Sequence, residues 1–144
     1  MTNLVAAALA LSFLQPDGTC PSASDAQAAF VSGSASEWPN YTEGPGARVQ
    51  RQYPDTVLTA QAKFVPLDEN GAAVCQYSNH VGWVITTALL GATKGDTIRT
   101  SYWRSEFTGS DPSQDQPGRE TVDVCMKKQR RQAVPSVGCA FKTE

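Results

Sequence analysis

The sequence predicts an α+β domain in which one or two short helices pack on an antiparallel sheet of about five strands. Three observations lead to this prediction: apolar and polar residues alternate from 57 to 64, an Asn-Gly pair stands at 70–71, and four cysteines lie far apart. The chain has 144 residues, and a domain of that size buries about two-thirds of its unfolded surface. We therefore expect a single domain over residues 20–144.

Residues 1–19 differ in character from the rest. The run from Leu4 to Leu14 is apolar except for Ser12. Its length suits the hydrophobic region of a signal peptide and is too short to span a bilayer. However, no Lys or Arg precedes the run and no small-x-small cleavage site follows it. Two interpretations stay open for 1–19, a signal-peptide remnant and an N-terminal helix that packs on the domain.

The first element of the domain is a predicted helix over residues 22–33. Ser22 or Ser24 can cap its free amides, and Gly33 can end it. Its small apolar face would consist of Ala28, Ala29 and Phe30. The next stretch, 34–47, is rich in Pro, Gly and Ser, which predicts a loop. We expect Trp38 and Tyr41 of this loop to pack against the core rather than bind a ligand.

A β-hairpin follows the loop. Leu58, Ala60, Ala62 and Phe64 share one face of the first strand, and Pro66 marks its end. The turn 68–71 contains Asn70-Gly71, a strong hairpin signal. In the returning strand 72–78, Ala73, Cys75 and Tyr77 share a face, so Cys75 is expected to be a buried half-cystine.

The rest of the chain is predicted as further strands. Residues 81–90 are apolar or threonine on both faces, which predicts a central strand covered on both sides, and the glycines in 91–96 predict a turn. Residues 97–107 are predicted as another strand, and 108–118, without any apolar residue, as an exposed, mobile loop. The pattern at 119–128 fits strand or helix, and 136–142 is predicted as a final short strand.

The cysteines are Cys20, Cys75, Cys125 and Cys139. An even number at wide spacing favours two disulfides, and the absence of a Cys-x-x-Cys pair argues against zinc and redox catalysis. Three connectivities are possible; Cys125–Cys139 is the local choice, and Cys20–Cys75 is then what remains. Two structural disulfides would place the protein outside the reducing cytosol, in the periplasm or secreted.

Charge and motifs make several functions improbable. The net charge of −2 gives no global positive field for nucleic-acid binding. His80, the only histidine, stands in a predicted turn without a nucleophile motif, and we interpret it as an exposed turn residue. The carboxylates Glu106, Asp111, Asp115, Glu120 and Asp123 gather around the polar loop, where they serve solvation more often than catalysis. We expect no catalytic residue, metal or cofactor.

Two stretches have the composition of binding sites. Tyr102, Trp103 and Arg104 are of the types that dominate interface energetics, and the alternative is that Trp103 belongs to the core. The predicted binding residues are Tyr102, Trp103, Arg104, Glu106, Asp111 and Asp115. The basic run 127–131, KKQRR, is either a solvated turn within the Cys125–Cys139 loop or a contact for an acidic partner.

Several of these residues together carry a resemblance. Cys20-Pro21, Cys75-Gln76-Tyr77, Trp103 and Cys139-Ala140-Phe141 resemble the pattern of a group of small exported bacterial domains of unknown function. The resemblance covers most of the chain after residue 19 and implies export and disulfides, but no activity.

The sequence therefore favours a non-catalytic exported domain that binds another protein, such as an immunity protein or an enzyme inhibitor. One alternative is a carbohydrate- or surface-binding module that uses Trp38, Tyr41 and Trp103. Another is a hydrolase with an unrecognised carboxylate site. We expect no membrane span, and the sequence does not decide the oligomeric state.

Overall fold

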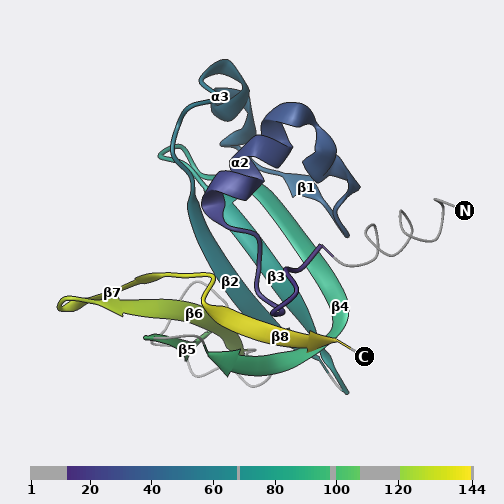
Figure 1. Cartoon of the computed structure of the whole chain (residues 1–144), viewed down its shortest axis with the longest axis vertical. Coiled ribbons are helices and arrows are strands. Elements are labelled where there is room, and N and C mark those ends of the chain that lie inside the picture. Colours follow the sequence, from purple (N-terminus) through teal and green to yellow (C-terminus); the bar gives the residue numbers. More distant parts are fainter. Residues whose placement is uncertain (1–12, 68, 98–99, 108–120, 144) are drawn as a thin grey trace, which may run out of the picture.

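The computed structural model describes residues 13–67, 69–97, 100–107 and 121–143 (Figure 1). Helices α2 and α3 and a 3-10 helix η1 cover Ala23–Ser32, Ala47–Gln52 and Ser34–Glu37. The strands are β1 (Thr42–Glu43), β2 (Thr59–Pro66), β3 (Gly71–Ser78), β4 (Trp83–Thr97), β5 (Ser101–Phe107), β6 (Thr121–Gln129), β7 (Gln132–Pro135) and β8 (Cys139–Thr143). In the described part of the chain, no helix is long and apolar enough to cross a membrane.

The described strands form one antiparallel sheet of eight strands, so the expected number of about five is wrong. The strand order is β1-β4-β3-β2-β6-β5, while β7 pairs with β6 and β8 pairs with β4. The additional strands are short or polar. β1 has two residues, and the burial pattern of β7 is largely exposed, so neither carries the alternation that identifies a strand in a sequence.

Strand β4 runs for 15 residues straight through the predicted turn 91–96, and that turn prediction is wrong. On β3, Gly71 and Ala72 are neighbours, but their partners on β4 are Ala92 and Leu90. Gly91 is thus the extra residue of a β-bulge, and its φ of 82° is a conformation that glycine adopts freely. A glycine with positive φ serves a bulge as well as a turn, and its presence in the sequence does not distinguish the two.

The central strand is also less covered than expected. Ile85 and Thr87 of β4 are fully buried, whereas Leu90 is 64% exposed and Thr86 and Ala88 are half-buried. One face of this part of the sheet therefore packs on the core, and the opposite face lies partly open to solvent. The strand is apolar or threonine on both faces, and that pattern predicted more burial than the structure has.

The β2–β3 hairpin agrees with the prediction. Its register pairs Ala62 with Cys75 and Ala60 with Tyr77. Ala62, Cys75 and Tyr77 are completely buried, as their common face required. Pro66, the last residue of β2, pairs with Gly71 at the turn.

Helix α2 also agrees with the prediction. The Ser22 hydroxyl accepts a hydrogen bond from the Asp25 amide at 3.2 Å, and Gly33 caps the other end with a φ of 86°. Phe30 is buried and Ala29 packs against the core as expected, but Ala28 is exposed and Ala26 takes its place on the apolar face.

The segment that precedes α2 is tied to the sheet. The Phe13 ring stacks on Trp38 with ring centroids 6.0 Å apart, and the Gly18 carbonyl accepts a hydrogen bond from the Phe141 amide at 2.9 Å. The Tyr77 hydroxyl donates to the Pro21 carbonyl at 2.6 Å, and Cys20 forms a disulfide with Cys75. Residues 13–21 thus pack on the domain, while residues 1–12 lie outside the described part.

The second disulfide joins the other end of the sheet. Cys125 of β6 is bonded to Cys139 of β8, which confirms both preferred pairings. Phe141 of β8 contacts Trp103 of β5 edge to face. Since β8 pairs with β4 and touches β5, it links two strands that lie four places apart in the strand order, and the sheet curls on itself (Figure 1).

The remaining differences concern loops and boundaries. The predicted loop 34–47 contains η1 and β1 and leads into α3, a helix of six residues without a side-chain cap. The ambiguous stretch 119–128 is strand in its described part, the final strand begins at Cys139 rather than at 136, and β5 begins at Ser101 rather than at 97. The predicted loop 108–118 lies outside the described residues.

Candidate functional site

The predicted binding residues of β5 divide between the two faces of that strand. Tyr102, Arg104 and Glu106 alternate with Ser101, Trp103 and Ser105, so these two sets point in opposite directions. Arg104 and Glu106 are exposed and form an ion pair, and Tyr102 is 36% exposed. The structure brings these three residues together on one outer face of β5, which is the last strand in the order.

Trp103 lies on the inner face of the same strand. It stands opposite Cys125 in the register, and its ring centroid is 5.5 Å from that of Phe141. Its Nε1 is buried and finds no hydrogen-bond acceptor among the described residues. Trp103 thus packs over the second disulfide and fixes β5, whereas Tyr102 and Arg104 face outward. Asp111 and Asp115, the other two predicted binding residues, lie outside the described part of the chain.

Strands β6 and β7 form a hairpin that extends away from the helices (Figure 1). Gln129 and Gln132 are the last paired residues, and Arg130 and Arg131 form the turn. The predicted basic run therefore occupies the end of this hairpin. We call its four cationic residues the basic tip, and they are Lys127, Lys128, Arg130 and Arg131.

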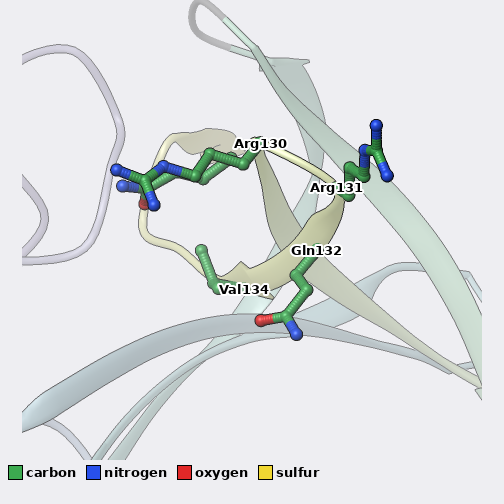
Figure 2. Close-up of a pocket in the computed structure, with 5 residues that line it drawn as sticks. Arg130, Arg131, Gln132 and Val134 are labelled. Carbon is green, nitrogen blue, oxygen red and sulfur yellow. The ribbon is translucent and has the colours of Figure 1, made fainter.

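All four residues of the basic tip are exposed. Among the described residues, the cations that form ion pairs are Arg51, Lys94 and Arg104. None of the four side chains of the basic tip forms an ion pair or a hydrogen bond with a described residue. Figure 2 shows a hollow at this end of the hairpin, lined by Gln129, Arg130, Arg131, Gln132 and Val134. The end of the hairpin thus presents the cations of the basic tip and the side-chain amides of Gln129 and Gln132, and no described residue binds them.

The base of this hairpin is held firmly. The Ser136 amide donates to the Cys125 carbonyl at 3.1 Å, and the Ser136 carbonyl accepts from the Ala62 amide at 3.0 Å. The Ser136 hydroxyl also accepts from the Gly138 amide at 2.9 Å. Together with the Cys125–Cys139 disulfide, these bonds anchor both ends of the segment that carries the basic tip.

The described carboxylates of this region lie apart. Glu106 pairs in the register with Val122, while Asp123 pairs with Ser105, so the two acids point to opposite faces of the sheet. Asp123 accepts a hydrogen bond from the Ser105 hydroxyl at 2.7 Å and forms an ion pair with Lys94 at 2.9 Å. Asp111, Asp115 and Glu120 are outside the described residues.

Burial alone would raise the pKa of Asp123, but the hydrogen bonds from Lys94 and Ser105 outweigh it and hold the pKa below its ordinary value. The carboxylate is therefore ionised and engaged at neutral pH. On the outer face, burial lowers the pKa of the Lys63 ammonium, while the nearby charge of Glu106 acts in the opposite direction. The Lys94–Asp123 contact thus has the character of a structural ion pair.

His80 lies in the turn between β3 and β4 and is exposed, as expected. Asn79 organises this turn, because its side-chain oxygen accepts from the Val81 amide at 2.9 Å and its amide nitrogen donates to the Gly46 carbonyl at 3.0 Å. Among the described residues, no group of three or more metal-ligating side chains converges.

The aromatic residues of the carbohydrate-binding alternative are engaged by the core. Trp38 packs between Phe13 and Tyr77, and Tyr41 is half-buried with its hydroxyl donating to Glu43 at 2.7 Å. The expectation that Trp38 and Tyr41 pack on the core is confirmed, and their arrangement adds no support to sugar binding.

No family model, no curated protein and no solved structure matches the chain. The function is therefore inferred from the residues of this chain and their geometry.

Proposed function

We propose that this chain is an exported, non-catalytic domain that binds another protein, in the manner of an immunity protein or an enzyme inhibitor. The observation that carries the proposal is the outer face of β5, where Tyr102 and Arg104 stand exposed on a strand fixed by the packing of Trp103. Tyrosine and arginine are among the residues that contribute most to protein interfaces.

The rigidity of this face supports a role in binding. A side chain on a strand that is already ordered loses less conformational entropy on association than one on a loop. Strand β5 pairs with β6 along its whole length, from Ser101 opposite Lys127 to Phe107 opposite Thr121. The outer face is therefore arranged before a partner arrives.

One further observation favours an extracytoplasmic compartment, and another favours binding over catalysis. The Cys20–Cys75 and Cys125–Cys139 disulfides suit an oxidising environment. Glu106 and Asp123, which point to opposite faces, do not form a paired acid and base, so their placement favours binding over hydrolysis.

The experiment that tests the proposal compares two double variants in the native host. Tagged wild-type protein is recovered from the extracytoplasmic fraction, and a protein that co-purifies is identified and produced separately. Its affinity is then measured by calorimetry for the wild type, for Tyr102→Ala/Arg104→Ala, and for the matched control Tyr53→Ala/Arg48→Ala. Tyr53 and Arg48 are an exposed tyrosine and an exposed arginine in and beside α3.

We expect the β5 variant to bind at least about 10-fold more weakly, the effect of losing one interface anchor. The control variant should bind like the wild type, and both should keep the wild-type melting temperature within a few degrees. A protein recovered only from the cytoplasm, or equal affinities for the two double variants, would contradict the proposal.

A further inference from the structure

The basic tip concentrates positive charge on a protein that is negative overall. The chain carries 12 Lys and Arg residues and a net charge of −2, yet four of those 12 cations lie within residues 127–131. All four are exposed and lie on a hairpin that extends from the described body (Figure 1). Positive charge is thus concentrated at one place on the surface of a negative domain. Such an arrangement is common where electrostatic attraction guides the approach of an oppositely charged partner.

The two arginines of the turn point to opposite sides. Figure 2 shows the guanidinium groups of Arg130 and Arg131 directed away from each other, with Gln132 and Val134 below them. A flat anionic surface can meet only one side of such a ribbon at a time. A site with carboxylates on two facing walls can meet both guanidinium groups at once.

The backbone of the turn is strained at one of these arginines. Arg130 has a φ of 56°, a left-handed conformation that residues with a Cβ rarely adopt. Two-residue hairpin turns prefer glycine or asparagine at positions with positive φ. Arginine stands at a position where glycine would fit better, which points to a use of its side chain outside the fold.

The anchored base makes the basic tip a pre-arranged binding element. The Cys125–Cys139 disulfide and the hydrogen bonds of Ser136 fix the hairpin at its root. Lys128 is further tied through its amide, which donates to the Thr100 carbonyl at 3.3 Å. Fewer backbone degrees of freedom are then lost when the tip is bound.

We propose that the basic tip inserts into a carboxylate-rich cleft of the partner protein, with Arg130 and Arg131 pairing with acids on opposite walls. The proposal rests on the proposed function and deepens it, because it assigns a chemical class to the surface that the domain recognises. Guanidinium groups pair with carboxylates through two parallel hydrogen bonds, and such pairs are the strong ones when they are shielded from water.

A protein fits the described surface better than the other anionic macromolecules. Duplex DNA is held by many phosphate contacts, commonly 6–10, and the basic tip offers four cations beside a net negative domain. Attraction to an anionic bilayer contributes only about 1 kcal/mol per cation, and firm attachment also needs apolar side chains that insert, of which residues 127–132 contain none. The amides of Gln129 and Gln132 suit carboxylate acceptors.

The test uses fluorescein-labelled poly-L-glutamate as the acidic probe and measures its affinity by anisotropy at low salt. The variants are Arg130→Gln and Arg131→Gln, and the matched control is Arg48→Gln, an exposed arginine of α3 that changes the net charge equally. We expect each tip variant to weaken binding about threefold, and the control by far less. Unlabelled duplex DNA and phosphatidylglycerol vesicles serve as competitors.

Three results would overturn the inference: no binding of the probe, a loss confined to one of the two tip arginines, and stronger binding of DNA or vesicles than of the probe at equal charge. None of these results removes the β5 face, so the proposed function would stand or fall by its own experiment. Conversely, probe binding with no extracytoplasmic protein partner would leave the cationic site and overturn the function.

Discussion

The two disulfides hold two regions of very different construction. Around Cys20–Cys75, strands β2, β3 and β4 pack against α2 and the segment 13–21, and Tyr77 and Ile85 are completely buried. Around Cys125–Cys139, a thin ribbon of β6 and β7 leaves the body, and from Lys127 to Ala133 every side chain is exposed. We call these the packed region and the ribbon region.

The two regions have different roles: the packed region stabilises the fold, and the ribbon region holds exposed side chains where a partner can bind them. The packed region buries its large apolar side chains and closes a long loop, since its cysteines have a sequence separation of 55. The ribbon region is buried only at its root, which includes Val124, Cys125 and Met126, and its cross-link has a sequence separation of only 14. Substitutions in the packed region should therefore mainly change stability, and substitutions at the end of the ribbon should mainly change binding.

The largest expected effect comes from Cys20→Ala/Cys75→Ala. Removal of this long cross-link should lower the free energy of unfolding by about 4 kcal/mol, since it frees the largest loop of the unfolded chain. Urea denaturation followed by circular dichroism measures the loss. Retention of wild-type stability would show that residues 13–21 do not depend on the disulfide for their packing.

The second-largest effect on stability is expected from removal of the other disulfide. Cys125→Ala/Cys139→Ala should lower the free energy of unfolding by about 3 kcal/mol, because the closed loop is shorter. Unlike the first double variant, it should also speed amide hydrogen exchange in β7 more than in β3. Equal exchange rates in these two strands, relative to wild type, would contradict a separate role for the ribbon anchor.

Asp123 connects the two regions, because its partner Lys94 belongs to β4. The pKa of Asp123 lies below its ordinary value of 3.8 in the folded protein, so the ionised carboxylate stabilises the fold above that pH. This stabilisation is lost as the pH falls through the folded-state pKa.

We expect Asp123→Asn to be less stable than wild type by about 1 kcal/mol at pH 7, a small value because Lys94 is partly exposed. The difference should shrink as the pH falls below 3.8, because the carboxyl of the unfolded chain then takes up a proton, and it should vanish below the lower pKa of the folded protein. Denaturation at pH 7, 5 and 3 measures it. A difference that stays constant over these three values would rule out the ion pair as its source.

The smallest stability effect has the opposite sign. Arg130→Gly relieves the left-handed strain in the turn and should raise the free energy of unfolding by roughly 0.5–1 kcal/mol. The same variant should bind poly-L-glutamate more weakly, because a cation is lost. A loss of stability in this variant would mean that the arginine side chain supports the fold itself.

The sequence predicted the packed region well because its signals are local. Alternation along β2, the Asn70-Gly71 turn and the serine cap of α2 each depend on a few neighbouring residues. The pairing Cys20–Cys75 followed by elimination once Cys125–Cys139 was preferred, and both bonds are present.

The ribbon region was harder to predict because its determinants are not local. Gly91 forms a bulge rather than a turn, and only the register with β3 reveals this. The turn at Arg130 lacks the Asn-Gly signal, so the run KKQRR predicted a turn but not a protruding hairpin. The inward direction of Trp103 depends on its pairing with Cys125, which the sequence left as one of two alternatives.

The most direct test of the division between the two regions is a titration of the oxidised, ¹⁵N-labelled protein with poly-L-glutamate, followed by amide chemical shifts. Our account predicts shifts that centre on Lys127, Lys128, Arg130 and Arg131 and fade along β6 and β7, with α2, α3 and β3 unchanged. Shifts spread evenly over both regions, or centred on α3, would contradict the claim that the basic tip is the site that binds carboxylates.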